Sequence, residues 1–265
     1  MTNSFIYNIT NIMNKVLLKY NPDLRESNRR GGFYWLKGKP YVSVTTVLKV
    51  LDKPALLFWS NREIYRAMMV NPGISEEEAM LAPHKTSDKA KTRGTTVHSL
   101  VENYKHGLDY LEKVDDFFKP YAKAFHQFVE DHKLKVLENE RSVISKKYGY
   151  AGTLDMLAQI GDSDKVYIFD IKTGKDVYPE AFLQMSAYKQ ALEEIGVKVD
   201  GMGVILLKTG QDGKPTGTYK FETGEDSFPI FKACLDIWKW KSQDLIASVK
   251  KNLKPYIEPE VPANS

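Results

Sequence analysis

The sequence predicts a mixed α/β protein, in which a β-sheet core is flanked by helices and a helical subdomain precedes it. Two observations predict this class. Before Lys135, apolar residues recur mainly at helical spacing, whereas after it short alternating segments are separated by turn residues. One further helical segment interrupts the strands and another follows them, an order typical of a mixed sheet covered by helices.

The N-terminal part begins with a predicted hairpin in "GGFYWLKGKPYVSVTTVL", turning at Lys37-Gly38-Lys39. Helical spacing follows in "KPALLFWSNREIYRAMMV", with Pro54 in the first turn. A second helix is predicted in "SEEEAMLA", where Ser75 is a suitable N-cap. A third is expected from about residue 95 to 105, ending near Gly107, and a fourth opens at Pro120.

The C-terminal half carries the predicted sheet. Three strands are expected in "KVLENERSVISKKYGYAGTLDMLAQIGDSDKVYIFDIKTGK", and two more in "GMGVILLKTG" and "GTYKFE". The helix "PEAFLQMSAYKQALEEIG" lies between them, and "SFPIFKACLDIWKWKSQDLIASVKKNL" is one long closing helix. We therefore divide the chain into a mainly helical part (1–134), a core (135–252) and a proline-rich tail (253–265).

Composition limits the classes of function. A net charge of +4 and a pI near 8.8 fit a polyanionic partner, and equally an ordinary basic protein. Cys234 is the only cysteine, which excludes an internal disulfide and an iron–sulfur or zinc site built from several cysteines of this chain. No apolar run approaches the ~20 residues that span a bilayer. The start resembles no signal peptide, so a cytoplasmic location is expected, with organelle import as the alternative.

Two aspartates and a lysine carry the chemistry. In "YIFDIKTGK", Asp170 and Lys172 are two residues apart, so both point to one face of the predicted strand. A turn centred between Asp162 and Ser163 would place Asp155 directly opposite Asp170. Opposed carboxylates repel each other, and a hard divalent cation such as Mg²⁺ removes the conflict. The alternative for Asp170 and Lys172 alone is an ion pair at a sheet edge.

Two helical pairs extend this set. His98 and Glu102 are four residues apart in "RGTTVHSLVE", and Gln184 and Tyr188 have the same spacing in "QMSAY". Each pair also has an interpretation without a function. The first can be part of a solvated helix face, and the second can pack in the core. Glu102 is interpreted either as a partner of His98 or as part of that solvated face. Glu140, in "LENERS", either approaches the site from the preceding strand or lies at the rim of the core, and the rim is the favoured interpretation.

The motifs "RGTTVHSLVE", "GTLD", "DIKTGK" and "QMSAY", in this order, resemble the RecB-like branch of the PD-(D/E)XK nucleases. The early segment "VSVTTVLKVLDKPALLFW" is similar to phage-type exonucleases and, in layout, to the mitochondrial genome maintenance exonuclease group. The resemblance covers roughly Val42 to Tyr188. It implies a restriction-endonuclease-like mixed sheet and a phage or prophage origin. Leu154 stands where the motif has proline, and the four-cysteine iron–sulfur cluster of many relatives is excluded here.

The resemblance also implies roles for individual residues. Asp155, Asp170, the backbone carbonyl of Ile171 and His98 match the metal ligands, with Mg²⁺ or Mn²⁺ as the ion, and Lys172 matches the catalytic lysine. Gln184 and Tyr188 match a pair that lines the nucleic-acid channel. Lys175 and Arg93 belong to basic groups near the site and are expected to contact DNA.

The sequence therefore predicts a metal-dependent deoxyribonuclease. An exonuclease acting on single-stranded DNA or free DNA ends is expected, with the helical N-terminal part arching over the substrate. The first alternative is a structure-selective or nicking endonuclease on the same core. The second, from another class, is a module that binds DNA without cutting it. No Walker motif is present, so no ATP-driven helicase activity is expected of this chain.

Overall fold

The structure is a computed structural model that describes residues 32–104, 112–210 and 212–251. Within these ranges the strands form one mixed seven-stranded sheet in the order β1-β2-β4-β5-β6-β7, with β3 paired to β4. The predicted mixed α/β class is confirmed. The strands are β1 (Phe33–Leu36), β2 (Lys39–Ser43), β3 (Lys135–Ser145), β4 (Tyr150–Gln159), β5 (Tyr167–Gly174), β6 (Gly201–Thr209) and β7 (Pro215–Gly224).

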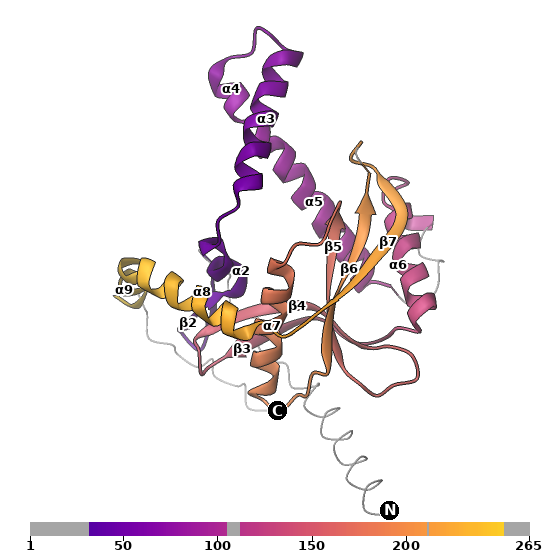
Figure 1. Ribbon diagram of the computed structural model, residues 1–265, viewed down its shortest axis with the longest axis vertical. Helices are drawn as coiled ribbons and strands as arrows, with labels where there is room; N and C mark the ends of the chain where they lie inside the picture. The colour runs from indigo at the N-terminus through magenta and orange to yellow at the C-terminus, as the bar shows by residue number, and fades with distance from the viewer. Residues whose placement is uncertain (1–31, 105–111, 211, 252–265) are drawn as a thin grey trace, which may run out of the picture.

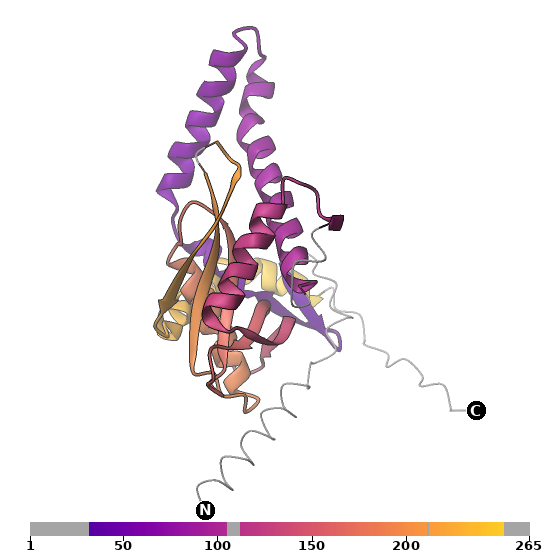
Figure 2. The same cartoon turned by 90° about the vertical axis from the view of Figure 1, so that its right-hand side faces the viewer.

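Helices cover both faces of this sheet (Figures 1 and 2). One apolar cluster joins one face to α6 and the lower end of α5, and a second joins the other face to α2, α7 and α8. The helical segments are α2 (Val44–Val47), η2 (Leu48–Val50), α3 (Pro54–Val70), α4 (Glu76–Met80), α5 (Ala82–Glu102), α6 (Lys119–His132), α7 (Glu180–Glu193), α8 (Phe228–Lys241) and α9 (Gln243–Lys251).

Several local predictions are confirmed with their physical causes. The β1–β2 hairpin turns through Lys37 and Gly38, both at positive φ (48° and 73°), as a two-residue turn of the primed type requires. Ser75 caps α4, because its hydroxyl accepts a hydrogen bond from the Glu78 N–H at 3.2 Å. Pro120 lies in the first turn of α6 as expected.

The helices α3, α4 and α5 form an arm that projects away from the sheet (Figures 1 and 2). The helix α3 contains no buried residue along its seventeen residues. The arm begins beside α2 and returns to the body through the lower half of α5, where Val97 and Val101 are buried. Its two ends therefore meet the body at different elements.

Two predicted boundaries are wrong. The helix expected to start near residue 95 begins at Ala82, and Gly94 lies inside it. A glycine inside a helix costs about 1 kcal/mol, and we infer that the contact of α5 with α3 offsets this cost. The predicted long closing helix is two helices, because Ser242 leaves the helical conformation at φ −110° and ψ 21°. This break lets α9 turn so that Ile246 and Val249 pack on the core.

The predicted division at residue 134 remains a prediction. The sheet itself extends across that position, because β2 pairs in parallel with β4 through Val42 and Ser43. The helix end expected near Gly107 and the proline-rich tail (253–265) lie outside the described residues. Among the residues that are described, no helix is both long and apolar enough to cross a membrane.

Candidate metal centre

The candidate site lies where β4 changes partners. One edge of β4 is paired with β3 along its length, so β2 and β5 share the other edge. The strand β2 takes Tyr150 and Ala151, and β5 takes residues from Met156 onward. Residues 152–155 lie between the two partners, and this gap in the ladder leaves room for polar side chains at the centre of the sheet.

Asp155 is fixed at this fork. Met156 pairs with Phe169, which confirms the predicted centre of the β4–β5 turn. The backbone ladder ends with this pair and does not include Asp155, the neighbour of Met156. The Asp155 carboxylate instead accepts a hydrogen bond of 2.7 Å from the Ile171 N–H. The side chain thereby replaces a backbone acceptor and is held towards β5.

Asp170 and Lys172 form an ion pair on β5. The Lys172 ammonium donates a 2.7 Å hydrogen bond to Asp170 Oδ1 and lies 2.7 Å from Oδ2. The Asp170 side chain is 3% exposed, whereas that of Lys172 is 40% exposed. Asp170 Oδ2 is buried and accepts no well-directed hydrogen bond. The sequence prediction that both side chains share a face is consistent with this contact, but Asp170 is paired with the lysine rather than with Asp155.

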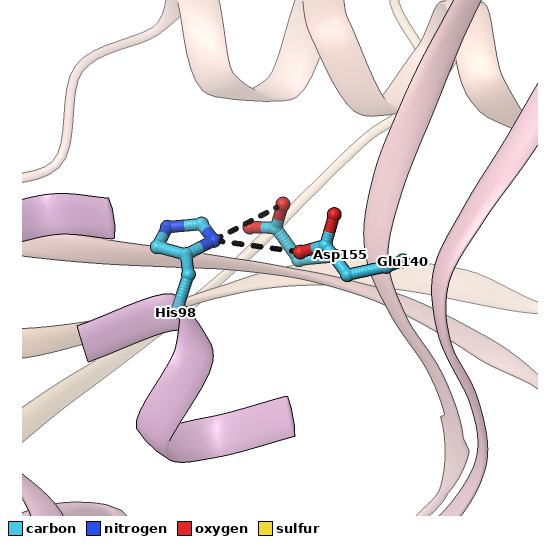
Figure 3. Close-up of side chains that lie close together, drawn as sticks. All are labelled: His98, Glu140 and Asp155. Carbon is cyan, nitrogen blue, oxygen red and sulfur yellow. Dashed lines mark ion pairs between the residues drawn. The ribbon is translucent and has the colours of Figure 1, made fainter. Parts of the chain in front are cut away.

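His98 reaches the site from α5. It follows Val97, whose burial turns this face of the helix towards the sheet. The imidazole Nδ1 lies 3.6 Å from Asp155 Oδ1 and 3.8 Å from Glu140 Oε1, as Figure 3 shows. Both separations are longer than a hydrogen bond. The three side chains therefore surround a space rather than closing on one another.

Glu140 lies at the site, which was the less favoured of the two positions that the sequence predicted for it. It lies on β3 between Asn139 and Arg141, which pair with Met156 and Leu154, so it stands opposite Asp155. Its backbone is in the left-handed region at φ 47°, which is uncommon for a residue other than glycine and is often found at functional positions. The sequence contains a signal for this position. A β3–β4 turn centred on "KKYG" (146–149) pairs Glu140 with Asp155, just as a turn between Asp162 and Ser163 pairs Asp155 with Asp170.

The pair Gln184 and Tyr188 supports the site from α7. The Gln184 amide donates a 3.3 Å hydrogen bond to Asp170 Oδ1. The Tyr188 ring lies over Gly152, where a Cβ atom would stand 2.3 Å from Tyr188 Cε1. Glycine is required there because the ring occupies the space that any side chain would need. Tyr188 therefore packs in the core and also lines the site.

These residues line one cavity of about 320 Å³. One part of its wall is charged and comes from α5 and the strands: His98, Glu140, Asp155 and Lys172. The other part carries hydroxyl groups from the β1–β2–α2 segment and from β4: Tyr34, Ser43, Thr45 and Thr153. Val44, Gly152, Gln184 and Tyr188 complete the lining. The cavity is thus a polar pocket with acids on one side.

Burial and neighbouring charges shift the pKa values of Asp155, His98 and Lys172. Burial, followed by repulsion from Asp170, raises the pKa of Asp155 from 3.8 to about 7. Burial lowers the pKa of His98, but Glu140 and Asp155 outweigh it, so that pKa is raised. For Lys172, burial likewise lowers the pKa and attraction to Asp170 and Asp155 raises it above its usual value. The site therefore favours additional positive charge.

The geometry fits a divalent cation. Ligand atoms of His98, Glu140 and Asp155 all lie within 4.8 Å of one another. An octahedral ion with bonds of about 2.1 Å separates neighbouring ligand atoms by about 3 Å and opposite ones by about 4 Å. One imidazole with two carboxylates suits Mn²⁺ and other first-row metals, and carboxylates with water suit Mg²⁺. The structure brings Asp155 and His98 into this group, and leaves Asp170 outside it.

The remaining predicted residues lie around the site. Glu102 is exposed at the end of α5, and its backbone carbonyl accepts a hydrogen bond from Asn139. Lys175 is exposed just after β5. Arg93 donates from Nη1 to the Gly213 carbonyl at 3.2 Å, which ties α5 to the β6–β7 turn. For Ile171 the contact in the structure is made by its N–H, and the metal-binding role of its carbonyl stays a prediction.

Comparison with known proteins yields no family. No family model matches this chain, and no curated protein matches it. Among solved structures, an alkaline exonuclease from Laribacter hongkongensis is similar at a TM-score of 0.40 and 13% identity, over 81% of this chain and 92% of that one. A candidate exonuclease from Eubacterium rectale is similar at 0.29 and 11%, over 80% and 73%. At these values the function of the chain has to be argued from its own site.

Proposed function

We propose that this protein is a metal-dependent nuclease that hydrolyses phosphodiester bonds of DNA. The observation that carries the proposal is the convergence of His98, Glu140 and Asp155 on a cavity that also receives Lys172. His98, Glu140 and Asp155 would hold Mg²⁺ or Mn²⁺. When bound, such an ion supplies Lewis-acid polarisation of the phosphate and a more acidic water molecule.

The chain's own residues would orient and stabilise the reacting groups. Lys172 lines the cavity and is held by Asp170, so its ammonium can stabilise negative charge that develops on the phosphate. Gln184 donates to the same Asp170 oxygen as Lys172, Oδ1, and so fixes the lysine indirectly. The hydroxyl-bearing wall offers neutral donors to phosphate and sugar oxygens of the substrate. Lys172, Gln184 and the hydroxyl-bearing side chains all line the same cavity, and the buried Asp170 holds the first two in place.

The exonuclease mode is proposed from the position of the arm. Val44 and Thr45 of α2, which precedes the arm in the chain, and His98, on the helix that returns from it, line the same cavity. The free end of a DNA strand could thread beneath the arm. A closed circle has no end to thread, so it could enter only if the arm moved away from the cavity. The alternatives remain a structure-selective or nicking endonuclease, and a module that binds DNA without cutting. The pairing of buried Asp170 with Lys172 at the cavity favours an enzyme over that module.

The test uses end-labelled single-stranded DNA, linear duplex and closed single-stranded circles with Mg²⁺, Mn²⁺ or EDTA. The wild type and the Asp155→Ala and Lys172→Ala variants are compared. Metal-dependent shortening of linear DNA by the wild type alone, with circles spared, is the expected result. Cleaved circles would support the endonuclease. DNA binding without cleavage in any metal would support the binding module and overturn the proposal.

A further inference from the structure

One side of α3 is apolar and exposed along most of its length. Side chains on this side are 52% to 73% exposed: Leu57, Phe58, Tyr65, Met68 and Met69. At about 100° per residue these positions fall within about a third of the helix circumference, so they form one continuous stripe. We call these five residues the arm stripe. Large apolar side chains that are exposed together are typical of a surface that another segment or molecule covers.

The arm stripe faces away from the contact that holds α3 on α5. The partly buried residues of α3 include Trp59, Glu63 and Ala67, which are spaced four apart on the other side of the helix. On that side Glu63 accepts a 3.2 Å hydrogen bond from the Thr86 hydroxyl of α5. The helix has no buried residue, although helices in proteins are stabilised mainly by the packing of an apolar face. The arm stripe is the apolar face that α3 still has to pack.

The sequence before the described residues carries an apolar pattern of matching length. In "SFIYNITNIMNKVLLKY" (4–20), apolar residues recur at helical spacing at Phe5, Ile9, Ile12, Met13, Val16 and Tyr20. The opposite side of such a helix would carry Asn8, Asn11, Asn14 and Lys15, with Tyr7 and Leu18 as its apolar exceptions. The segment has seventeen residues, as α3 has. Apolar surface is unfavourable in water, so this pattern and the arm stripe would each be stabilised by a cover.

The chain enters the described part beside α2, close to the base of the arm. The Gly32 carbonyl accepts a 2.8 Å hydrogen bond from the Ser43 N–H, and a Cβ atom on Gly32 would stand 2.5 Å from Thr46 Oγ1. Thr46 belongs to α2, and the chain from Thr46 to Pro54 spans at most about 29 Å. Residues 21–31 can span about 36 Å when extended, so they reach from Gly32 to the start of α3. A helix of residues 4–20 would then be about 26 Å long, like α3.

We infer that residues 4–20 pack as a helix on the arm stripe of the same chain, antiparallel to α3. A segment tethered by a short linker has an effective concentration of about a millimolar, which favours it over a second molecule. The linker sets the direction, because Tyr20 is next to it in sequence and α3 starts at Pro54. Placing Tyr20 beside Pro54 sets Ile9 beside Tyr65. The arm would then contain three long helices, and the inference does not depend on the proposed activity.

The first experiment measures how fast a maleimide labels a thiol on the arm stripe of the full chain. Tyr65→Cys supplies the thiol, and peptide mass spectrometry separates it from Cys234, which is buried. The change is then combined with Ile9→Asp/Val16→Asp, which places two charges in the apolar pattern of residues 4–20. Because labelling requires the cover to open, we expect this pair to speed labelling at least about tenfold.

The matched control is Asn11→Asp/Asn14→Asp, which adds the same two charges on the polar side of the segment. This pair should leave the labelling rate of the Tyr65→Cys thiol within about twofold, because the apolar contact is kept. The comparison separates a loss of packing from a general effect of negative charge.

A second experiment identifies the occupant of the arm stripe. Ile9→Cys is combined with Tyr65→Cys, and a short bismaleimide joins the two thiols. We expect a product within one chain, formed at a rate that does not change with protein concentration. Asn11→Cys with Tyr65→Cys is the control. It should react at least about tenfold more slowly, because position 11 would face away from α3.

Three results would overturn the inference. One is labelling of the Tyr65→Cys thiol at the same rate with and without Ile9→Asp/Val16→Asp. A second is cross-linking only between chains, at a rate that rises with protein concentration, because the arm stripe would then join two copies. A third is flotation of the protein with vesicles of phosphatidylcholine and phosphatidylglycerol that Ile9→Asp/Val16→Asp abolishes, with no cross-link within the chain, because the segment would then bind lipid.

Discussion

The Ile171 N–H donates a 2.7 Å hydrogen bond to Asp155 Oδ2, although the β4–β5 ladder ends one pair earlier at Met156 and Phe169. A side-chain carboxylate therefore takes the place of a backbone carbonyl at the centre of the sheet. This contact fixes Asp155 next to Glu140 and His98. It also buries the carboxylate, and the burial has consequences for stability that can be measured.

The first prediction concerns pH. Burial and Asp170 raise the pKa of Asp155 to about 7, so the folded protein holds a proton that the unfolded chain loses near pH 4. The metal-free protein should therefore lose stability as pH rises from about 4 to about 7, by up to about 4 kcal/mol, and little more above that. Urea unfolding in EDTA at pH 5 and pH 8 measures the change. Asp155→Asn should flatten the profile, and an unchanged profile in that variant would assign the effect to another group.

The second prediction concerns Glu140. Removing one of three ligands should weaken binding of Mn²⁺, so we expect Glu140→Gln to lower its affinity at least about tenfold by calorimetry. Glu102→Gln is the matched control, because Glu102 is exposed at the end of the helix that carries His98. Equal losses in both variants would contradict the assignment of Glu140.

The third prediction concerns the buried charge of Asp170. Lys172→Met leaves Asp170 without its cation, which should destabilise the metal-free protein by about 1–2 kcal/mol because Lys172 is partly exposed. The double variant Asp170→Asn/Lys172→Met should recover most of that stability. It should still show no hydrolysis of DNA. Chemical denaturation measures the first effect and DNA cleavage the second. Recovered cleavage in the double variant would show that Lys172 is only structural.

The fourth prediction concerns the contact between Gly152 and Tyr188. A Cβ atom at position 152 would stand 2.3 Å from the Tyr188 ring, so Gly152→Ala should destabilise the protein by about 1–3 kcal/mol. Gly174→Ala is the control, since nothing lies within 4 Å of a Cβ atom there. In a double-mutant cycle, Tyr188→Ala should cost less in the Gly152→Ala background than in the wild type. Additive effects would mean that the ring does not limit this position.

Local rules were sufficient for most elements and for part of the site. Turn residues fixed the β4–β5 register, and with it the positions of Asp155 and Asp170 on neighbouring strands. Helical spacing identified the segment that carries His98, although its start was misplaced by thirteen residues. For Glu140 the core rim was favoured over the site because the β3–β4 register was not used, although the same rule applied to it.

The sequence by itself determined the periodicities, the turns and the residue types that can bind a metal, because these depend on neighbours along the chain. Only the tertiary structure decided which of those residues meet. It joined Glu140 rather than Asp170 to His98 and Asp155, and it raised α3 into an arm with an exposed face. These outcomes depend on how α5 and α7 pack against the fork in β4, and packing between segments far apart in sequence follows no local pattern.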